Sequence, residues 1–285
     1  MTTLLQISDP HFGTERPRVM EALRRLSRQL APDVLVLSGD ITQRARAAQF
    51  NAARAFVDSL NIGTLLAIPG NHDIPLYNVA ARVLCPYANH RRVFGNDLEP
   101  VLDTTDLLVL CVNCTRWYRH EDGEVSRAQV IRVARLLEAA RPGQLRIVVT
   151  HQPVAVTRPQ DEKNVLHGSQ NAIQSWSRSG CDLILGGHIH LPFVLSLHER
   201  QVGLPRRIWA VQAGTALSTR VRHEAGNSVN VIRCGADSGT VAVTGAGRRA
   251  TVERWDYDER NCSFTRRALN DFVLDGASPP TVRAA

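Results

Sequence analysis

Lysine is almost absent from this chain of 285 residues: Lys163 is the only one among 34 basic residues, so arginine supplies nearly all of the basic charge behind the net +7. The arginines form no run of five or more. This scatter does not indicate a nucleic-acid groove, although the charge permits one. A positive surface attracts anions, so we expect a small anionic partner such as a phosphate ester or a carboxylate.

Cysteines are too few for a small disulfide-stabilised scaffold. The chain contains six of them: Cys85, Cys111, Cys114, Cys181, Cys234 and Cys262. Cys111 and Cys114 have the spacing of a redox or zinc half-site, but they end a strand-like run, in which positions three apart point to opposite faces. No second pair with this spacing follows, so we expect buried thiols.

Long apolar segments are missing as well. The N-terminus shows no basic segment and no apolar stretch of signal-peptide length, and no later segment reaches the length of a membrane span. We therefore expect a cytoplasmic protein without a membrane span; a homo-oligomer stays open. Hydrophobic residues make up 44% and charged residues 21% of the chain, which excludes a disordered or fibrous protein.

The first part of the chain predicts alternating strands and helices. Three apolar runs predict buried strands, at 3–7, 33–37 and 64–68. Apolar residues repeat at helical spacing at 17–30, 43–60 and 75–93, with a break at Pro86 in the last segment. Each strand ends in a polar turn, so the pattern predicts an α/β sheet with ligand-type side chains at its carboxyl edge.

The rest of the chain continues this pattern and then changes. Further strands are predicted at 100–102, 107–112, 145–149 and 181–185, with helices at 126–140 and 169–179 and a long loop at 154–168. Later strands are predicted at 193–197, 208–211, 228–234, 240–244, 251–255 and 263–267. We expect these to form a second, largely antiparallel sheet. No linker divides the chain, which predicts a single domain over 1–270 and a tail over 271–285.

Polar side chains of ligand type follow the predicted buried strands. They are Asp9, His11, Asp40, Asn71, His72, His151, His188 and His190. The carboxyl ends of strands in an α/β sheet meet in one crevice, so we expect these groups to converge. Taken singly, each is explained as a turn or capping residue. Together, carboxylates and imidazoles suit Mn, Fe or Zn ions, and their number suits two ions that share a bridging carboxylate.

Five sequence blocks resemble the motifs of the calcineurin-like metallophosphoesterases. In order, they are Asp9-x-His11, Gly39-Asp40, Gly70-Asn71-His72-Asp73, His151 and Gly187-His188-x-His190. The resemblance covers residues 4 to 215 and implies a four-layer αββα sandwich, with two mixed sheets flanked by helices. It also implies the ligand sets: Asp9, His11 and His190 for one ion, Asn71, His151 and His188 for the other, and Asp40 as the bridge.

The resemblance implies a catalytic mechanism too. A hydroxide bridging the two ions would attack the phosphorus, because metal binding lowers the pKa of water to about 7. His72 would not bind metal; it would stand beside the substrate phosphate as a general acid or transition-state stabiliser. Asp73 would orient His72 or its loop.

Differences between sub-families narrow the expected substrate. Ile41-Thr42-Gln43 follows Asp40 in place of the Asp-Arg-Gly of protein Ser/Thr phosphatases, and Gln152 stands where many relatives have a second His. The blocks look most like those of bacterial cyclic-nucleotide and glycerophosphodiester phosphodiesterases, so we expect a small phosphodiester. The alternatives are a nuclease, a lipid-linked pyrophosphate hydrolase and a non-catalytic metal-bound scaffold.

Specificity is expected from loops around the ions. The candidates for contact with the substrate are Tyr77, Arg82 and the segments 116–120 and 158–167, in particular Arg116, Trp117, His120, Arg158 and His167. Trp117 either stacks on a base or only packs against its neighbours. We expect the segments 213–215 and 227–228 to support the site from the later strands.

Overall fold

The computed structural model describes residues 1–235 and 248–275, so the strand predicted at 240–244 lies outside the described residues. Two six-stranded sheets form the centre of the fold. In spatial order, the first contains β12 (Ser263–Val273), β11 (Arg249–Asp258), β10 (Ser228–Cys234), β1 (Thr2–Ile7), β2 (Val34–Ser38) and β3 (Thr64–Ile68). The second contains β4 (Val101–Asp103), β5 (Leu107–Cys111), β6 (Leu145–Val149), β7 (Leu183–Gly186), β9 (Trp209–Gln212) and β8 (Phe193–Ser196).

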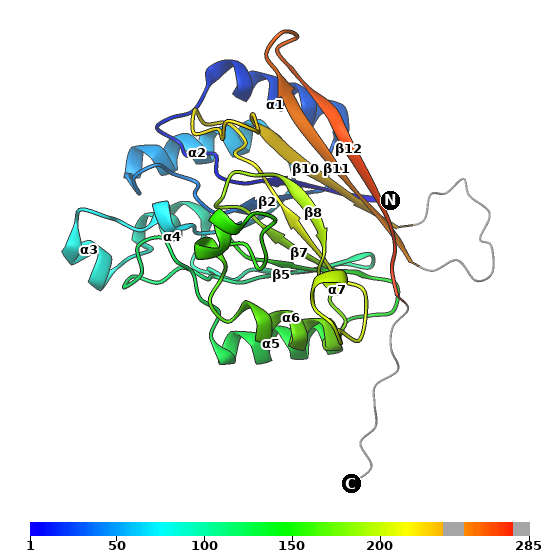
Figure 1. The fold of residues 1–285 in the computed structure, drawn as a ribbon. Coiled ribbons are helices and arrows are strands. Elements are labelled where there is room, and N and C mark those ends of the chain that lie inside the picture. Colours follow the sequence, from blue (N-terminus) through cyan, green and yellow to red (C-terminus); the bar gives the residue numbers. More distant parts are fainter. Residues whose placement is uncertain (236–247, 276–285) are drawn as a thin grey trace.

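Helices cover the outer faces of the two sheets. On the first sheet lie α1 (Pro17–Leu30) and α2 (Ala47–Ser59), and on the second lie α5 (Arg127–Glu138) and α6 (Ser169–Ser179) (Figure 1). Shorter elements are α3 (Val79–Leu84), α4 (Ala88–Phe94), α7 (Leu197–Arg200) and the 3₁₀ turns η1 (Asn71–Asp73) and η2 (Pro159–Asn164). The prediction of a four-layer αββα sandwich with two mixed sheets is confirmed.

Alternation along the strands separates the hydrophobic layers. In β1, Leu5 packs with Leu23 of α1 and Phe56 of α2, whereas Leu4 packs between the sheets in one cluster with Val109 of β5. Successive strand residues point to opposite faces, and both faces of these strands are covered. This explains why the central strands read as continuous apolar runs.

The later strands do not form a sheet of their own, so that prediction is wrong. β10 pairs antiparallel with β1 and carries β11 and β12 with it, while β9 pairs parallel with β7 in the other sheet. The alternating pattern identifies strands but does not say which open edge each one covers. Both sheets are therefore mixed. In the first, β1 to β3 are parallel on one side and β10 to β12 pair antiparallel on the other; in the second, the parallel strands lie between an antiparallel strand at each edge.

Residues 271–275 also differ from the predicted tail. β12 continues to Val273, Leu274 is buried, and the Leu274 N–H donates to the Arg248 carbonyl oxygen at 2.7 Å. The predicted helix at 75–93 is divided into α3 and α4 on either side of Pro86, and the predicted loop at 154–168 contains η2. Within residues 1–235 and 248–275, no helix is long and apolar enough to cross a membrane.

The ligand-type side chains lie where strands of both sheets end. β1, β2 and β3 come from the first sheet, and β6 and β7 from the second. The sheets are joined beside this edge by Gln6 of β1, whose Nε2 donates to the Gly186 carbonyl oxygen of β7 at 3.1 Å. The crevice is therefore shared by two sheets. We had expected it at the edge of a single sheet.

Candidate metal centre

The backbone at the strand ends adopts an uncommon conformation. Among the described residues, nine non-glycine residues have positive φ, and five of them are predicted ligands. Their φ values are 51° at Asp9, 44° at His11, 48° at Asp40, 71° at His188 and 54° at His190. Such left-handed residues carry backbone strain, which clusters at functional sites. The turns therefore bend the chain sharply and aim these side chains inward.

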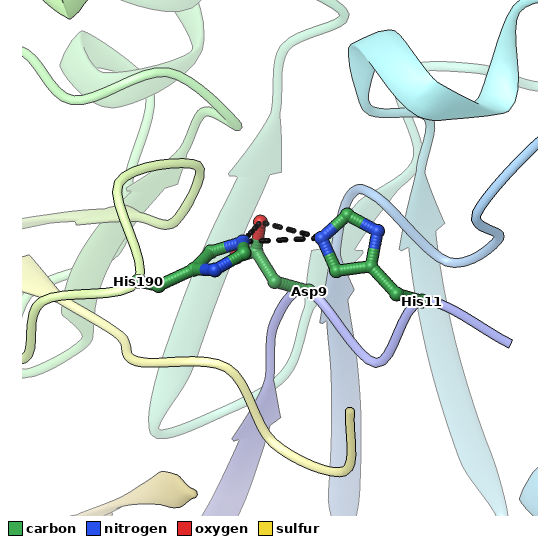
Figure 2. A group of neighbouring side chains, drawn as sticks. All are labelled: Asp9, His11 and His190. Atoms are coloured by element: carbon green, nitrogen blue, oxygen red, sulfur yellow. Dashed lines mark hydrogen bonds and ion pairs between the residues drawn. The ribbon is translucent and has the colours of Figure 1, made fainter. Parts of the chain in front are cut away.

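Asp9, His11 and His190 form one group of ligand atoms (Figure 2). The Nε2 atoms of the two imidazoles are 3.1 Å apart, and Asp9 Oδ1 lies 3.3 Å from His190 Nε2 and 3.9 Å from His11 Nε2. Asp9 and His11 are fully buried. These three side chains match the ligand set predicted for one ion.

Asp40, His151 and His188 form a second group. Asp40 Oδ1 lies 3.3 Å from His151 Nε2, and Asn71 Oδ1 lies at the same distance, 3.3 Å, from that nitrogen. The other oxygen, Asp40 Oδ2, lies 3.7 Å from His11 Nε2 of the first group. Asp40 thus stands between the two groups, as the predicted bridging role requires.

Backbone carbonyls orient two of the imidazoles. The Nδ1 atom of His151 lies 2.9 Å from the Ser38 carbonyl oxygen, and that of His190 lies 2.6 Å from the Arg220 carbonyl oxygen. A carbonyl only accepts, so each Nδ1 carries a proton, and Nε2 is the ring nitrogen left to bind a cation. This arrangement is typical of histidines that bind metal.

Burial keeps two other imidazoles neutral. It lowers the pKa of His11 to about 3 and that of His188 to about 4. Their buried Nδ1 atoms find no hydrogen-bond partner within the described part of the chain. Neutral imidazoles are the protonation state that binds metal.

The carboxylates of the site are ionised. Burial raises the pKa of Asp9, but the charge of His190 and its hydrogen bond outweigh this effect and lower the pKa. Burial lowers the pKa of His151, but the charge of Asp40 outweighs it and raises the pKa to about 10. A cation bound between these groups would replace the His151 proton. The donor set therefore fits two cations.

His72 and Asp73 have separate roles at the turn after β3. The His72 N–H donates to Asp40 Oδ1 at 2.8 Å, and its Nδ1–H donates to the Gln43 carbonyl oxygen at 3.0 Å. The Asp73 carboxylate accepts from the N–H groups of Gly70, Ile41 and Thr42 and from the Thr42 hydroxyl, at 2.8 to 2.9 Å. Asp73 thus links the loop that follows β3, to which it belongs, with the loop that follows β2. His72 also groups geometrically with His11 and Asp40, although we predicted that it binds no metal.

A cavity of about 350 Å³ opens above the two groups. It is lined by Asp40, Asn71, His72, His188, Ile189 and His190 and, around the mouth, by Glu121, Asp161, Asn164, Arg220 and Arg222. We call the last five residues the rim, and we call Asp9, His11, Asp40, Asn71, His151, His188 and His190 the ligand cluster. Asp161 and Asn164 lie in the segment 158–167 that we expected to touch the substrate. The sequence did not point to Glu121, Arg220 and Arg222, because they lie in loops without periodicity and the chain is rich in arginine.

The residues named individually as substrate contacts do not line this cavity. Arg116 bonds Glu124 at 3.1 Å and Gln129 at 2.7 Å, and Arg158 pairs with Glu224. Trp117, His120 and His167 are exposed and project from neighbouring loops. The predicted segment 158–167 does reach the cavity, but through Asp161 and Asn164 rather than through Arg158 or His167.

Supporting contacts come from the loops that follow β6 and β9. The Thr215 hydroxyl donates to the Asp9 carbonyl oxygen at 2.6 Å, so the segment 213–215 contacts the turn of a predicted ligand. Asn227 Nδ2 donates to the Ser218 carbonyl oxygen at 2.9 Å and thereby holds the loop that contains Thr215. Gln152 is buried; its Oε1 accepts from Cys114 Sγ at 3.0 Å and its Nε2 donates to the Glu121 carbonyl oxygen. Cys111 and Cys114 are free and buried, as predicted.

The comparison with protein families agrees with this geometry. The family model described as calcineurin-like phosphoesterase (Metallophos) matches residues 2–192. The chain belongs to the calcineurin-like phosphoesterase family. The match includes every residue of the ligand cluster, while Arg220 and Arg222 lie beyond it. Two-metal sites are therefore the expectation for this chain, with the identity of the ions open.

Solved structures of this family share the fold. A dimetal phosphatase from Danio rerio superposes with a TM-score of 0.63 at 12% identity, over 96% of this chain and 99% of that one. A purple acid phosphatase, PPD1, from yellow lupin (Lupinus luteus) gives a TM-score of 0.68 at 10% identity, over 99% of this chain and 57% of that one.

One similar protein by sequence is UDP-2,3-diacylglucosamine pyrophosphatase LpxG of Chlamydia muridarum (strain MoPn / Nigg), which is 37% identical over 79 residues. The aligned part covers 26% of this chain and 23% of that protein, so the chain spans about a quarter of the length of the curated relative.

Proposed function

We propose that this phosphoesterase is a dinuclear-metal-dependent hydrolase of a small phosphodiester. The observation that carries the proposal is the convergence of both ligand groups on Asp40, beneath a cavity that His72 lines. Two cations bound there would supply a hydroxide nucleophile near neutral pH and offset charge on the phosphate oxygens. The ligand cluster would hold Mn, Fe or Zn ions, which accept both carboxylate and imidazole donors.

His72 would act on the leaving group. Its ring is fixed by the hydrogen bond from Nδ1 to the Gln43 carbonyl oxygen, and its Nε2 lies 2.9 Å from Nη1 of Arg220, which also lines the cavity. In the protonated form, Nε2–H gives its proton to the alkoxide oxygen as the bond between that oxygen and phosphorus breaks. Such proton transfer contributes about 10²- to 10⁴-fold in rate.

The lining favours a hydroxyl-rich alcohol over a nucleobase. Ile189 is the one apolar side chain among the lining residues, and within the described chain the lining includes no Phe, Tyr or Trp. A base would find no aromatic ring other than imidazole to stack on. Glu121 and Asn164 offer acceptors for hydroxyl groups. These contacts support a glycerophosphodiester-type substrate rather than a cyclic nucleotide.

A second candidate is a lipid-linked pyrophosphate hydrolase. The similarity to a protein named UDP-2,3-diacylglucosamine pyrophosphatase favours it. A diphosphate diester presents the same target as a phosphodiester, a phosphorus atom that carries two substituents and a negative charge. The same ligand cluster and His72 would therefore serve both reactions.

A hydrolysis panel with added Mn²⁺ tests the proposal. Substrates would be an aryl phosphodiester, an aryl monoester, a glycerophosphodiester, a cyclic nucleotide and a nucleoside diphosphate sugar. We expect the diesters to turn over, the glycerophosphodiester fastest, and a chelator to abolish the activity. Preference for the monoester would reject the phosphodiesterase proposal, and cleavage of the diphosphate alone would establish the second candidate.

A further inference from the structure

Two arginines of the rim differ in what their guanidinium groups contact. Arg222 Nη1 lies 3.0 and 3.1 Å from the two carboxylate oxygens of Asp161 and also donates to the Ile189 carbonyl oxygen at 3.2 Å. Arg220, in contrast, forms no ion pair with any carboxylate of residues 1–235 and 248–275. Arg222 is therefore neutralised within the protein, and Arg220 carries an uncompensated charge at the cavity.

The guanidinium of Arg220 contacts an imidazole and an amide. Its Nη1 lies 2.9 Å from His72 Nε2 and 3.2 Å from Gln43 Oε1. A guanidinium binds carboxylate or phosphate oxygens more strongly than neutral acceptors, because the hydrogen bonds are then charge-assisted at both ends. An oxyanion entering the cavity would thus be the better partner for Arg220.

The main chain holds Arg220 close to the ligand cluster. Its carbonyl oxygen accepts from His190 Nδ1 at 2.6 Å, and its N–H donates to the Ser218 hydroxyl at 3.1 Å. The backbone is therefore fixed against a predicted metal ligand, and the side chain reaches across to His72. The guanidinium is presented from a rigid support, which lowers the entropy cost of binding.

We propose that Arg220 binds a non-bridging oxygen of the substrate phosphate, with its guanidinium leaving His72 Nε2 for that oxygen. The exchange frees the lone pair of His72 Nε2 to take up a proton from solvent, and Nε2–H then gives that proton to the leaving oxygen. This assignment rests on the proposed hydrolysis at the same site. It also gives the substrate a required feature: the reacting phosphorus must carry a free, negatively charged oxygen on the side of the loop 218–222.

Binding of inorganic phosphate to the Mn²⁺-loaded protein tests this assignment without turnover. Calorimetry would compare the wild type with Arg220→Gln, Arg220→Lys and a control, Arg44→Gln, whose exposed guanidinium lies over the Tyr77 ring and does not line the cavity. We expect phosphate affinity to fall about 10- to 100-fold in Arg220→Gln. Arg220→Lys should lose less phosphate affinity, because lysine keeps the positive charge but not the paired N–H donors of the guanidinium. The phosphate affinity of Arg44→Gln should stay within about twofold of the wild type.

The amount of bound manganese, measured in each variant, distinguishes two roles of Arg220: binding of phosphate by its side chain, and support of the predicted metal ligand His190. Arg220 variants that keep their Mn²⁺ and their melting temperature but lose phosphate affinity support the assignment. Unchanged phosphate affinity in Arg220→Gln would overturn it, and so would loss of Mn²⁺ in both Arg220 variants, since the side chain would then act through the metal. If the wild type binds phosphate through Arg220 but turns over no diester, the proposed function fails and the assignment stands.

Discussion

The ligand cluster and the rim surround the same cavity but are built from different parts of the chain. Six of the seven residues of the ligand cluster are buried, and all seven follow buried strands. The rim comes from loops, and its exposure ranges from the buried Asp161 to Glu121, whose side chain is 62% exposed. The comparison teaches that the chemistry is fixed by the two sheets, whereas substrate choice depends on loops that can vary without disturbing those sheets.

Asp40→Ala is the change with the largest expected effect on this comparison. Asp40 belongs to the second group, and its Oδ2 lies 3.7 Å from His11 Nε2 of the first, so its loss removes the carboxylate that stands between the groups. We expect kcat to fall by more than the roughly 10²- to 10³-fold cost of losing one electrostatic donor, together with a loss of bound metal measured by mass spectrometry. The control is Asp58→Ala, an exposed carboxylate paired with Arg54 on α2. Full activity with two ions still bound would remove Asp40 from its bridging role.

His72→Ala comes next, because it stands between the ligand cluster and the rim. We expect a loss of about 10²- to 10⁴-fold in kcat, with the metal content unchanged. His120→Ala is the matched control, since that imidazole is exposed and outside the cavity lining. Loss of an ion in His72→Ala would instead assign His72 to the ligand group with His11 and Asp40.

Asp73→Asn should have an intermediate effect. The carboxylate accepts four hydrogen bonds that hold the loops after β2 and β3, and the amide can accept with only one of its two end atoms. We expect the free energy of unfolding to fall by about 1–3 kcal/mol and activity to fall about 10- to 100-fold. Urea unfolding and steady-state kinetics would measure the two effects. Asp122→Asn, at an exposed position, should change neither.

Trp117→Ala should have the smallest effect. The side chain is 45% exposed and lies outside the cavity lining. We expect kcat/KM for diesters to change by less than about threefold. A larger fall with a cyclic nucleotide alone would place Trp117 on the nucleobase, and it would extend the rim beyond the five residues defined above.

Sequence patterns predicted the ligand cluster because each member follows a short apolar run, and this relation is local along the chain. The edge that each later strand covers is not local: β10 reaches β1 across more than two hundred residues, pairing Leu5 with Val231. The alternation of apolar and polar residues predicts a strand but is the same whichever sheet the strand joins. The fold class was therefore predictable, while the placement of β8 to β12 was not.

The two arginines of the rim escaped prediction for a different reason. Arg220 and Arg222 lie in a loop with no strand before them to mark an end, in a chain where arginine is common. Arg116, Trp117 and Arg158 drew attention by composition, yet Arg116 and Arg158 bond to glutamates of their own surroundings. An arginine that pairs with a carboxylate of the protein can be told from one that does not only when the positions of the carboxylates are known, and these come from the structure.

The left-handed backbone of five predicted ligands restricts which amino acids can replace them. Asp and His enter this conformation more readily than most side chains, and β-branched residues hardly do. An exchange of Asp9 or His188 for another metal-binding residue must therefore satisfy both the ion and the turn. Mutational drift and engineering at these positions are confined to a short list of side chains, so a new metal preference is more accessible through the residues around the cluster than through the cluster itself.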